Sequence, residues 1–457
     1  MRKKYMIKYI QYIVVSLVLF TSCNYLDVEP VGKVIPDEIS EFRALLTTAY
    51  GTYPQYKRLL TVRSDEVFPD AYGLSYEDYI DLATWNDENP DPITPAYPWT
   101  DAYKTIFYAN SVIEDVMDAK EDVKTDTREQ LLAEAYSLRA YVHFDLLNLY
   151  AKWYTPETAA SDKGVPLFLK IDIGQEFVPS SVEAVYKQIL SDIEEAGKYM
   201  QVEEQPAATR YRFSKKALKA FEARVRLYRG EWELAQRAAE DILPQCPLED
   251  IVTGTVKPWT SESKEAILSM EQVSSTVIRE DMYVLDNVLS KYNMDKEGDV
   301  YKDARIGLYI QPGYAASYAN KGGNQGEKVS FRSSEIYLIA AEAAARQNGK
   351  LSIAKNYLLT LIKNRLQSSY YNEKAIEIEA MNQQQLIDEI MDERARELIF
   401  EGHRWFDLRR TTRPEIVKTY FDANFDMHTA TLQQDDPKYI IPYPQEATQN
   451  NPNLGGK

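Results

Sequence analysis

The sequence predicts a mostly α-helical protein built from tetratricopeptide-like helix pairs, an α-α superhelix, with irregular, loop-rich excursions. Three observations support this fold class. Apolar residues recur at three-to-four spacing along many segments. Two of these segments resemble copies of one helical hairpin. Two long stretches rich in proline and aromatic residues interrupt the helical pattern.

Residues 1–22 predict a lipoprotein signal peptide, with Cys23 as the lipid-bearing first residue of the mature chain. A cationic start precedes an apolar core at residues 10–20, and two small polar residues stand just before Cys23. The core is short for a spanning helix, which needs about 20 apolar residues, and polar side chains break it. An ordinary signal peptide is the alternative. Acyl chains on Cys23 would hold a large soluble body at the bilayer.

Charge and composition restrict the partners. The net charge of −17 and the pI near 4.9 argue against nucleic acid and against docking on anionic lipid, and they favour neutral ligands or proteins. Once Cys23 carries lipid, Cys246 is the second of only two cysteines, so we expect no intrachain disulfide. The chain has 34 tyrosines against 14 phenylalanines, so many of its aromatic rings carry a hydroxyl that must contact water or a hydrogen-bond partner.

Helices are expected wherever the apolar spacing is regular. The segments are 101–119, 126–150, 181–199, 214–229, 231–243, 332–347, 350–366 and 384–402. Ser181 and Ser214 stand where N-caps are expected, and Gly230 and Gly349 where one helix turns into the next.

Two stretches predict a repeated unit. AFEARVRLYRGEWELAQRAAEDIL and IAAEAAARQNGKLSIAKNYLLTLI align Gly230 with Gly349 and Ala235 with Ala354. Small residues on both sides of the turn would let two antiparallel helices touch, as in a tetratricopeptide pair. Two unrelated helical hairpins are the alternative.

The two irregular stretches, 60–100 and 244–331, are the expected ligand-binding regions. Long loops inside a compact protein are usually functional, and tyrosine and tryptophan rings offer stacking faces beside amides that hydrogen-bond. The candidate ligand-binding residues are Tyr72, Tyr76, Trp85 and Asn86 in the first stretch, and Tyr283, Tyr292, Tyr314 and Tyr318 in the second. The alternative is that these rings only pack the loops onto the helices.

Signals for catalysis are weak. The three histidines are His143, His403 and His428, and the sequence lacks the common nucleophile-elbow, zinc and phosphate-binding motifs. Glycoside hydrolysis needs a pair of carboxylates, but with 70 acidic residues the chain offers many such pairs, so their presence does not indicate this activity. The acidic run at 295–303 lacks the full spacing of a calcium loop and predicts a solvated turn. We therefore predict no catalytic residue, no cofactor and no metal ligand.

The segment ERARELIFEGHRWFDLRR, residues 393–410, predicts charged groups held against a core. On a continuous helix Glu393, Glu397 and Glu401 would recur every four residues, beside arginines and a large apolar side. Buried carboxylates are tolerated when arginine pairs with them. An active site is the weaker interpretation, because three arginines would neutralise these carboxylates.

This segment resembles the C-terminal signature of the SusD/RagB family of nutrient-binding lipoproteins. Other pieces are similar to the family in the expected order: CNYLDVEP at the processed start, PWTDAYKTIFYANSVIE, RAYVHFDLLNLYAKWYTPETAASDKGVPL, RSSEIYLIAAEAAAR and the closing YIIPYPQEATQNNPNLGG. The resemblance covers essentially the whole mature chain. It departs where many relatives carry glycine and this chain has Ala151.

The resemblance implies a single domain at residues 23–457, with an N-terminal SusD-like part at about 23–230 and a C-terminal SusD/RagB part at about 260–457. It implies four tetratricopeptide-like pairs and a lipid-anchored, surface-exposed place on the outer membrane of a Bacteroidetes-type bacterium. The matched motif residues are expected to build the fold: Trp99, Tyr103, Asn110, Arg139, Arg394, Glu397, Glu401, Arg404, Trp405 and Asp407.

The function that the resemblance implies is binding without catalysis. Such a protein captures oligosaccharides and delivers them to a SusC-like TonB-dependent transporter, and in the RagB-like branch the ligand is a peptide. Two other classes stay open: a surface glycoside hydrolase and a purely structural repeat scaffold.

Overall fold

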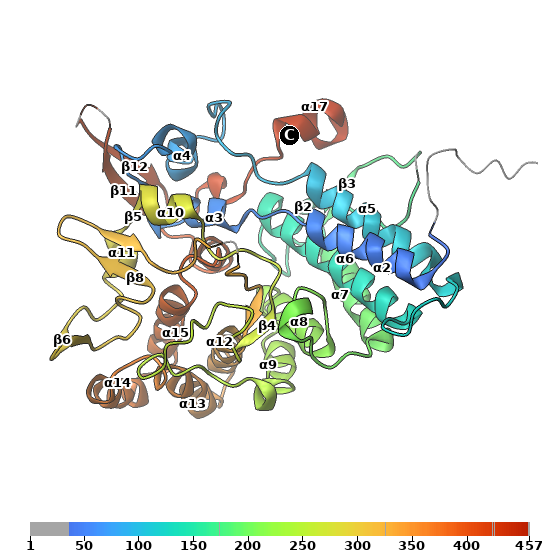
Figure 1. Ribbon diagram of the computed structural model, residues 1–457. Coiled ribbons are helices and arrows are strands. Elements are labelled where there is room, and N and C mark those ends of the chain that lie inside the picture. Colours follow the sequence, from blue (N-terminus) through green and yellow to red (C-terminus); the bar gives the residue numbers. More distant parts are fainter. Residues whose placement is uncertain (1–35, 173, 325, 423, 425, 456–457) are drawn as a thin grey trace, which may run out of the picture.

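The computed structural model describes residues 36–172, 174–324, 326–422, 424 and 426–455. The predicted signal peptide and Cys23 lie outside the described residues. Figure 1 shows a helical half on the right and lower side and a half rich in short strands on the left.

The helical half is a continuous series of packed helices, α2, α5, α6, α7, α8, α9, α12 and α13, each in contact with the next. Their bounds are α2 (Ile39–Thr52), α5 (Thr100–Asp115), α6 (Arg128–Tyr150), α7 (Val182–Tyr199), α8 (Lys215–Tyr228), α9 (Trp232–Glu240), α12 (Ser333–Ala345) and α13 (Leu351–Ile362). The predicted fold class is confirmed. The expected helices between 101 and 366 are all present, and α2 was missed.

The predicted helix boundaries rest on the expected side chains. The hydroxyl of Ser181 accepts a hydrogen bond from the Ala184 amide, and that of Ser214 from the Ala217 amide. Gly230 and Gly349 adopt φ values of +72° and +75°, which glycine reaches without steric cost. These two turns connect α8 to α9 and α12 to α13, and α9 packs on α12, so the two hairpins stack as consecutive repeats.

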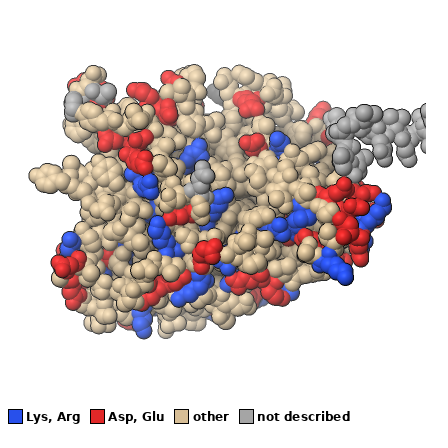
Figure 2. All heavy atoms as spheres, viewed as in Figure 1, with Lys and Arg blue, Asp and Glu red and all other residues tan. Residues whose placement is uncertain are grey.

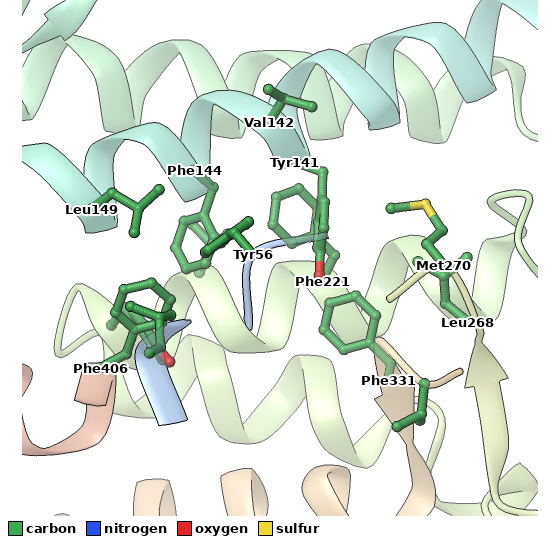
Figure 3. Close-up of a cluster of buried hydrophobic side chains, with 14 of the residues drawn as sticks. Tyr56, Tyr141, Val142, Phe144, Leu149, Phe221, Leu268, Met270, Phe331 and Phe406 are labelled. Atoms are coloured by element: carbon green, nitrogen blue, oxygen red, sulfur yellow. The ribbon is translucent and has the colours of Figure 1, made fainter. Parts of the chain in front are cut away.

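Helix α6 forms the centre of the core, with nearly every residue buried. The ring of Tyr141 lies edge-on to those of Phe213, Phe221 and Phe331, with centroids 5.9, 5.1 and 5.9 Å away. Figure 3 shows Tyr141 pointing from α6 towards Phe221 and Phe331. Its hydroxyl donates to Glu271 at 2.6 Å, so a tyrosine occupies a core position because its polar edge is satisfied.

The expected helix at 384–402 is wrong at its C-terminal end. Helix α15 (Gln383–Glu397) stops where Phe400 and Gly402 adopt φ of +62° and +73°, and α16 (Arg404–Arg410) begins after this turn. Glu401 therefore does not lie on the same helix as Glu393 and Glu397. A single periodic pattern cannot reveal such a break, because the turn residues keep the apolar spacing.

The prediction that this segment holds charges against a core is confirmed. Arg332 donates to Glu397 at 2.6 Å and to Glu401 at 2.8 Å, and Arg365 donates to Glu397 at 2.9 Å and to Glu265 at 2.7 Å. All five side chains are buried. Although α15 ends at Glu397, the turn that follows places Glu401 beside Arg332, in the same charge cluster as Glu397.

The remaining elements are mostly short and lie both inside and outside the two irregular stretches. The remaining helices are α3 (Lys57–Arg63), α4 (Tyr76–Ala83), α10 (Thr276–Asp281), α11 (Asp286–Leu289), α14 (Ser368–Ala380) and α17 (Gln445–Asn450). The 3-10 helices are η1 (Val116–Asp118), η2 (Ala207–Thr209), η3 (Leu243–Gln245), η4 (Pro437–Tyr439) and η5 (Pro452–Leu454). The strands are β1 (Val67–Pro69), β2 (Lys163–Pro166), β3 (Pro179–Ser181), β4 (Ala266–Leu268), β5 (Met282–Val284), β6 (Lys296–Glu297), β7 (Val300–Tyr301), β8 (Ile310–Pro312), β9 (Ser317–Ala319), β10 (Phe331–Arg332), β11 (Ile416–Phe421) and β12 (Met427–Leu432).

One antiparallel sheet joins the two excursions. Its strand order is β1-β5-β9-β8, with β1 from the first stretch and the other strands from the second. Four smaller pairs complete the strands: β10 with β4, β11 with β12, β2 with β3, and β6 with β7. Residues far apart in the sequence thus meet on one small sheet, at the opposite side of the molecule from α5 and α7 (Figure 1).

Candidate functional site: an aromatic strip

The four-stranded sheet buries one face and presents aromatic rings on the other. Alternate residues of a strand point to opposite faces, and Met282, Val284 and Ala319 are buried on the core side. The register places Phe68 opposite Tyr283, Tyr283 opposite Tyr318, and Tyr318 opposite Gln311, so these four side chains share the other face.

The row of rings continues onto the β11–β12 hairpin. The ring of Tyr420 stacks on that of Phe68 with centroids 4.6 Å apart, and the Phe68 and Tyr283 centroids are 6.1 Å apart. Phe68 is buried, whereas Tyr283, Tyr318 and Tyr420 are partly exposed. We call Phe68, Tyr283, Tyr318 and Tyr420 the aromatic strip.

A groove runs beside the strip. It has a volume of about 440 Å³ and lies between the β8–β9 turn and strand β11. Six of its lining residues are Tyr283, Asp286, Asn287, Tyr314, Val417 and Thr419. Tyr314 is fully exposed at the tip of the turn. In Figure 2 the surface at the left, over this turn, is uncharged.

Two tyrosines on or beside the strip, Tyr283 and Tyr76, have raised pKa values. Burial and the nearby carboxylate of Asp70 raise the pKa of Tyr283 to about 12. Burial and the neighbouring Tyr420 raise the pKa of Tyr76 to about 12. A protonated phenol both donates and accepts a hydrogen bond, and its ring offers an apolar face.

Four of the candidate ligand-binding residues lie on or beside this surface. Tyr283 and Tyr318 belong to the strip, and Tyr314 lines the groove. Tyr72 is 65% exposed, and the loop that carries it is fixed beside β5 because the Asp70 amide donates to the Asp281 carbonyl at 2.8 Å.

Three of the other candidates are buried and cannot stack on a ligand from solution. Trp85 is 1% exposed and its indole N–H donates to the Arg63 carbonyl at 3.0 Å. Tyr292 is 6% exposed and its hydroxyl donates to the Arg396 carbonyl at 2.7 Å. Tyr76 is buried beside Tyr420. The rings of these three residues pack the excursions onto the core.

Asn86 is exposed at the end of α4. Its amide nitrogen donates to Asp81 at 2.8 Å and to the Asn89 carbonyl at 3.2 Å, so the amide holds its own loop. Nothing in these contacts aims Asn86 at the strip, and its role in ligand binding stays a prediction.

The β11–β12 hairpin is the part of the candidate site that the sequence did not predict. One side of it is exposed, with Val417, Thr419 and Phe421 on β11, and the other side carries buried Ile416 and Lys418 with partly exposed Tyr420. This alternation of period two over residues 416–421 is the signal that would have predicted a strand and placed Tyr420 beside a sheet.

The other polar candidates serve the fold. His143 lies mid-helix between the Arg139 carbonyl and the Phe168 amide, and burial lowers its pKa to about 3. In the acidic run, Asp303 is buried and paired with Arg305 at 2.8 Å, whereas Glu297 is exposed on β6. Among the described residues, no group of three or more histidine, cysteine or acidic side chains is arranged to hold a metal ion.

Several matched motif residues connect parts of the fold, as expected. Arg139 donates to Asp192 at 2.6 Å and to Asn110 at 2.9 Å. Arg404 donates to Asp65 at 2.7 Å, which ties α16 to the segment before β1. None of the described helices is both long and apolar enough to span a bilayer.

Comparison of the sequence with models of known protein families shows which family the chain matches. Residues 281–455 match the family model described as "SusD family", and residues 24–227 match the model described as "Starch-binding associating with outer membrane". The chain belongs to the SusD/RagB family. The predicted resemblance is thereby confirmed, in both parts of the chain that carried its motifs.

Individual SusD relatives agree with this result. A SusD-like protein of Formosa agariphila is 31% identical over 243 residues, which are 50% of this chain and 44% of that protein's length. A SusD superfamily structure from Bacteroides thetaiotaomicron superposes with a TM-score of 0.73 at 20% identity, covering 91% of this chain and 98% of that one. A laminarin-binding SusD-like protein superposes with a TM-score of 0.60 at 18% identity, covering 82% and 92%.

Proposed function

We propose that this SusD-like chain is a surface lipoprotein that captures oligosaccharides on the aromatic strip and delivers them, without chemistry, to a SusC-like TonB-dependent outer-membrane transporter. Cys23 would carry the lipid. The proposal treats residues 23–457 as one domain, because the central sheet takes strands from both excursions and α16 packs on α3.

The row of rings across the sheet is the observation that carries this proposal. Adjacent strands are about 4.8 Å apart, so Tyr283 and Tyr318 present neighbouring apolar faces of sugar-ring size. A pyranose has a C–H-rich face for stacking and hydroxyls at its rim, which match the faces and hydroxyls of tyrosines. Gln311 continues the row with an amide for directional hydrogen bonds.

Three of the carboxylates beside the strip hold local structure, as expected of a binding surface. Asp70 accepts from the Tyr72 amide at 3.0 Å, and Asp281 accepts from the Ser75 hydroxyl at 2.8 Å. Asp422 lies 3.1 Å from the His428 imidazole. These three carboxylates stabilise the loops around the site.

The position of the strip supports delivery to a transporter. The strip occupies the strand-rich half, while the stacked helices occupy the other half, where the described chain begins at α2 (Figure 1). A lipid on Cys23 would tether the chain to the bilayer. The helices then offer a broad surface to a membrane partner while the strip faces the ligand.

Calorimetry on residues 24–457 tests ligand capture. The panel is a set of neutral hexasaccharides and short peptides, used at high protein concentration because a millimolar Kd corresponds to only about −4 kcal/mol. We expect saturable heat with at least one saccharide, lost in Tyr283→Ala and Tyr318→Ala and kept in Tyr371→Ala on α14. Heat with peptides alone would assign the RagB-like role, and no heat at all would contradict ligand capture.

Affinity purification of the full-length chain from its own outer membrane tests the partner and the anchor. We expect a TonB-dependent transporter to co-purify with the wild-type chain. Cys23→Ser should release the chain from the membrane fraction. A wild-type chain that purifies from membranes with no transporter would contradict the delivery step.

A further inference from the structure

Cations are scarce around the aromatic strip. The segments that form its surroundings are residues 69–83, 276–289, 310–319 and 416–432, and they contain nine acidic residues against two arginines or lysines. The whole chain has 70 acidic residues against 53 basic ones, so the local excess is far larger than the average. The nine acidic residues are all at least partly exposed: Asp70, Glu77, Asp78, Asp81, Glu280, Asp281, Asp286, Asp422 and Asp426.

Of the two cations in these segments, Lys418 is buried and Arg279 is partly exposed and paired with an acidic neighbour. Lys418 is 0% exposed behind the strip, where its ammonium donates to the Val62 carbonyl at 2.9 Å and lies 4.6 Å from the Trp85 ring centroid. Arg279 pairs with Glu280 at 2.9 Å. Anionic sugars are usually held by arginine or lysine in direct contact.

The neighbouring charged side chains do not change this balance. His428 is engaged with Asp422, and Lys291, just beyond α11, pairs with Asp392 on α15. Asp286 is the charged residue among those that line the groove. Figure 2 shows the uncharged surface over the β8–β9 turn and, beside it, acidic side chains over α10 and α4.

We infer that the strip and its groove take neutral oligosaccharides and exclude chains that carry carboxylate or sulfate groups. This inference rests on the proposed function and specifies the ligand class of the same site. Stacking on tyrosines needs no charge, whereas an anionic chain would meet Asp286 in the groove and an excess of carboxylates along the strip, where the one partly exposed cation, Arg279, already pairs with Glu280.

Matched pairs of ligands test the inference. The probes are hexasaccharides of β-1,3-glucan, α-1,4-glucan and β-1,4-mannan, each compared with the same hexasaccharide oxidised at its C6 hydroxyls to uronates. Binding to residues 24–457 is measured with a chelator present. We expect the oxidised form of any hexasaccharide that binds to bind at least about tenfold more weakly in 0.1 M salt. In 1 M salt the difference should shrink, because the Debye length falls from about 10 Å to about 3 Å.

Two variants test whether the difference in affinity between the neutral and oxidised hexasaccharides arises at the groove. Asp286→Asn should narrow the affinity ratio between the neutral and oxidised forms, and Asp101→Asn, on α5 in the helical half, should leave the ratio unchanged. Equal or tighter binding of an oxidised form would overturn the inference and leave oligosaccharide capture standing. Failure of both forms of every hexasaccharide to bind would instead contradict the proposed function itself, and the inference with it.

Discussion

Tyr283 on β5 and Tyr318 on β9 stand directly opposite each other in an antiparallel register, on the outward face of the sheet. They come from positions 35 residues apart, and the strand beyond Tyr283 carries Phe68 from the other excursion. The sheet thus aligns three scattered aromatic residues on one face, where Phe68 is buried and Tyr283 and Tyr318 are partly exposed. We propose that the ligand binds on this face.

Replacing the strip tyrosines by phenylalanine separates stacking from hydrogen bonding. Tyr283→Phe and Tyr318→Phe keep the ring face, so we expect oligosaccharide affinity to fall by no more than about threefold. The corresponding alanine variants lose the face and should weaken binding by at least about tenfold, about 1.4 kcal/mol. Titration calorimetry measures both. Equal losses for phenylalanine and alanine would show that the hydroxyls, not the faces, hold the ligand.

Trp85 is expected to stabilise the fold and not to contact the ligand. Its ring fills a core site beneath Lys418 and its N–H satisfies a backbone carbonyl. Trp85→Ala should lower the free energy of unfolding by about 3–5 kcal/mol, and Trp85→Phe should cost less. Urea denaturation followed by circular dichroism gives these values. Normal stability in Trp85→Ala together with lost binding would contradict the buried position.

Arg365 is expected to be essential to the buried charge cluster. It pairs with Glu397 and with Glu265, and all three side chains are 0% exposed. Arg365→Met leaves two carboxylates without their main partner, which should lower the free energy of unfolding by about 3–5 kcal/mol. Lys363→Met, exposed two residues earlier, should change it by about 0.5 kcal/mol or less. Similar values for the two variants in urea unfolding would refute the role of the cluster.

Acid should destabilise the fold partly through Glu342. Burial opposes its ionisation, yet the guanidinium of Arg410, 2.6 Å away, and those of Arg346 and Arg394 lower its pKa to about 2. Because the folded pKa lies below the ordinary value of 4.5, its contribution is complete above pH 4.5 and is lost as the pH falls towards 2. The loss is about 3 kcal/mol.

The measurement is the free energy of unfolding across this pH range. Glu342→Gln should show a shallower fall between pH 4.5 and 2 than the wild type. The exposed Glu233→Gln should keep the wild-type slope. An unchanged slope in Glu342→Gln would mean that other carboxylates dominate acid unfolding.

The sequence was a good guide to the helices because their signals are local. Apolar spacing, the caps at Ser181 and Ser214, and the turns at Gly230 and Gly349 all act within one or two turns of helix. The end of α15 was not predicted, because the turn at residues 398–403 keeps an apolar pattern and Phe400, a bulky residue, adopts a left-handed conformation.

The site was only partly predictable because it depends on distant pairing. Aromatic density identified the correct stretches, but not which rings face outwards. Trp85 and Tyr292 became buried because each satisfies its polar edge with a backbone carbonyl, which leaves the ring free to pack in the core. Phe68 and Tyr420 joined the strip only through the register of β1 with β5 and the docking of the hairpin.

A crystal structure of residues 24–457 bound to the hexasaccharide that gives the largest heat would locate the binding site. We expect a pyranose ring stacked on Tyr283 or Tyr318, with the chain continuing into the groove between the β8–β9 turn and β11. A saccharide bound at another surface, with both of these rings uncovered, would contradict this expectation.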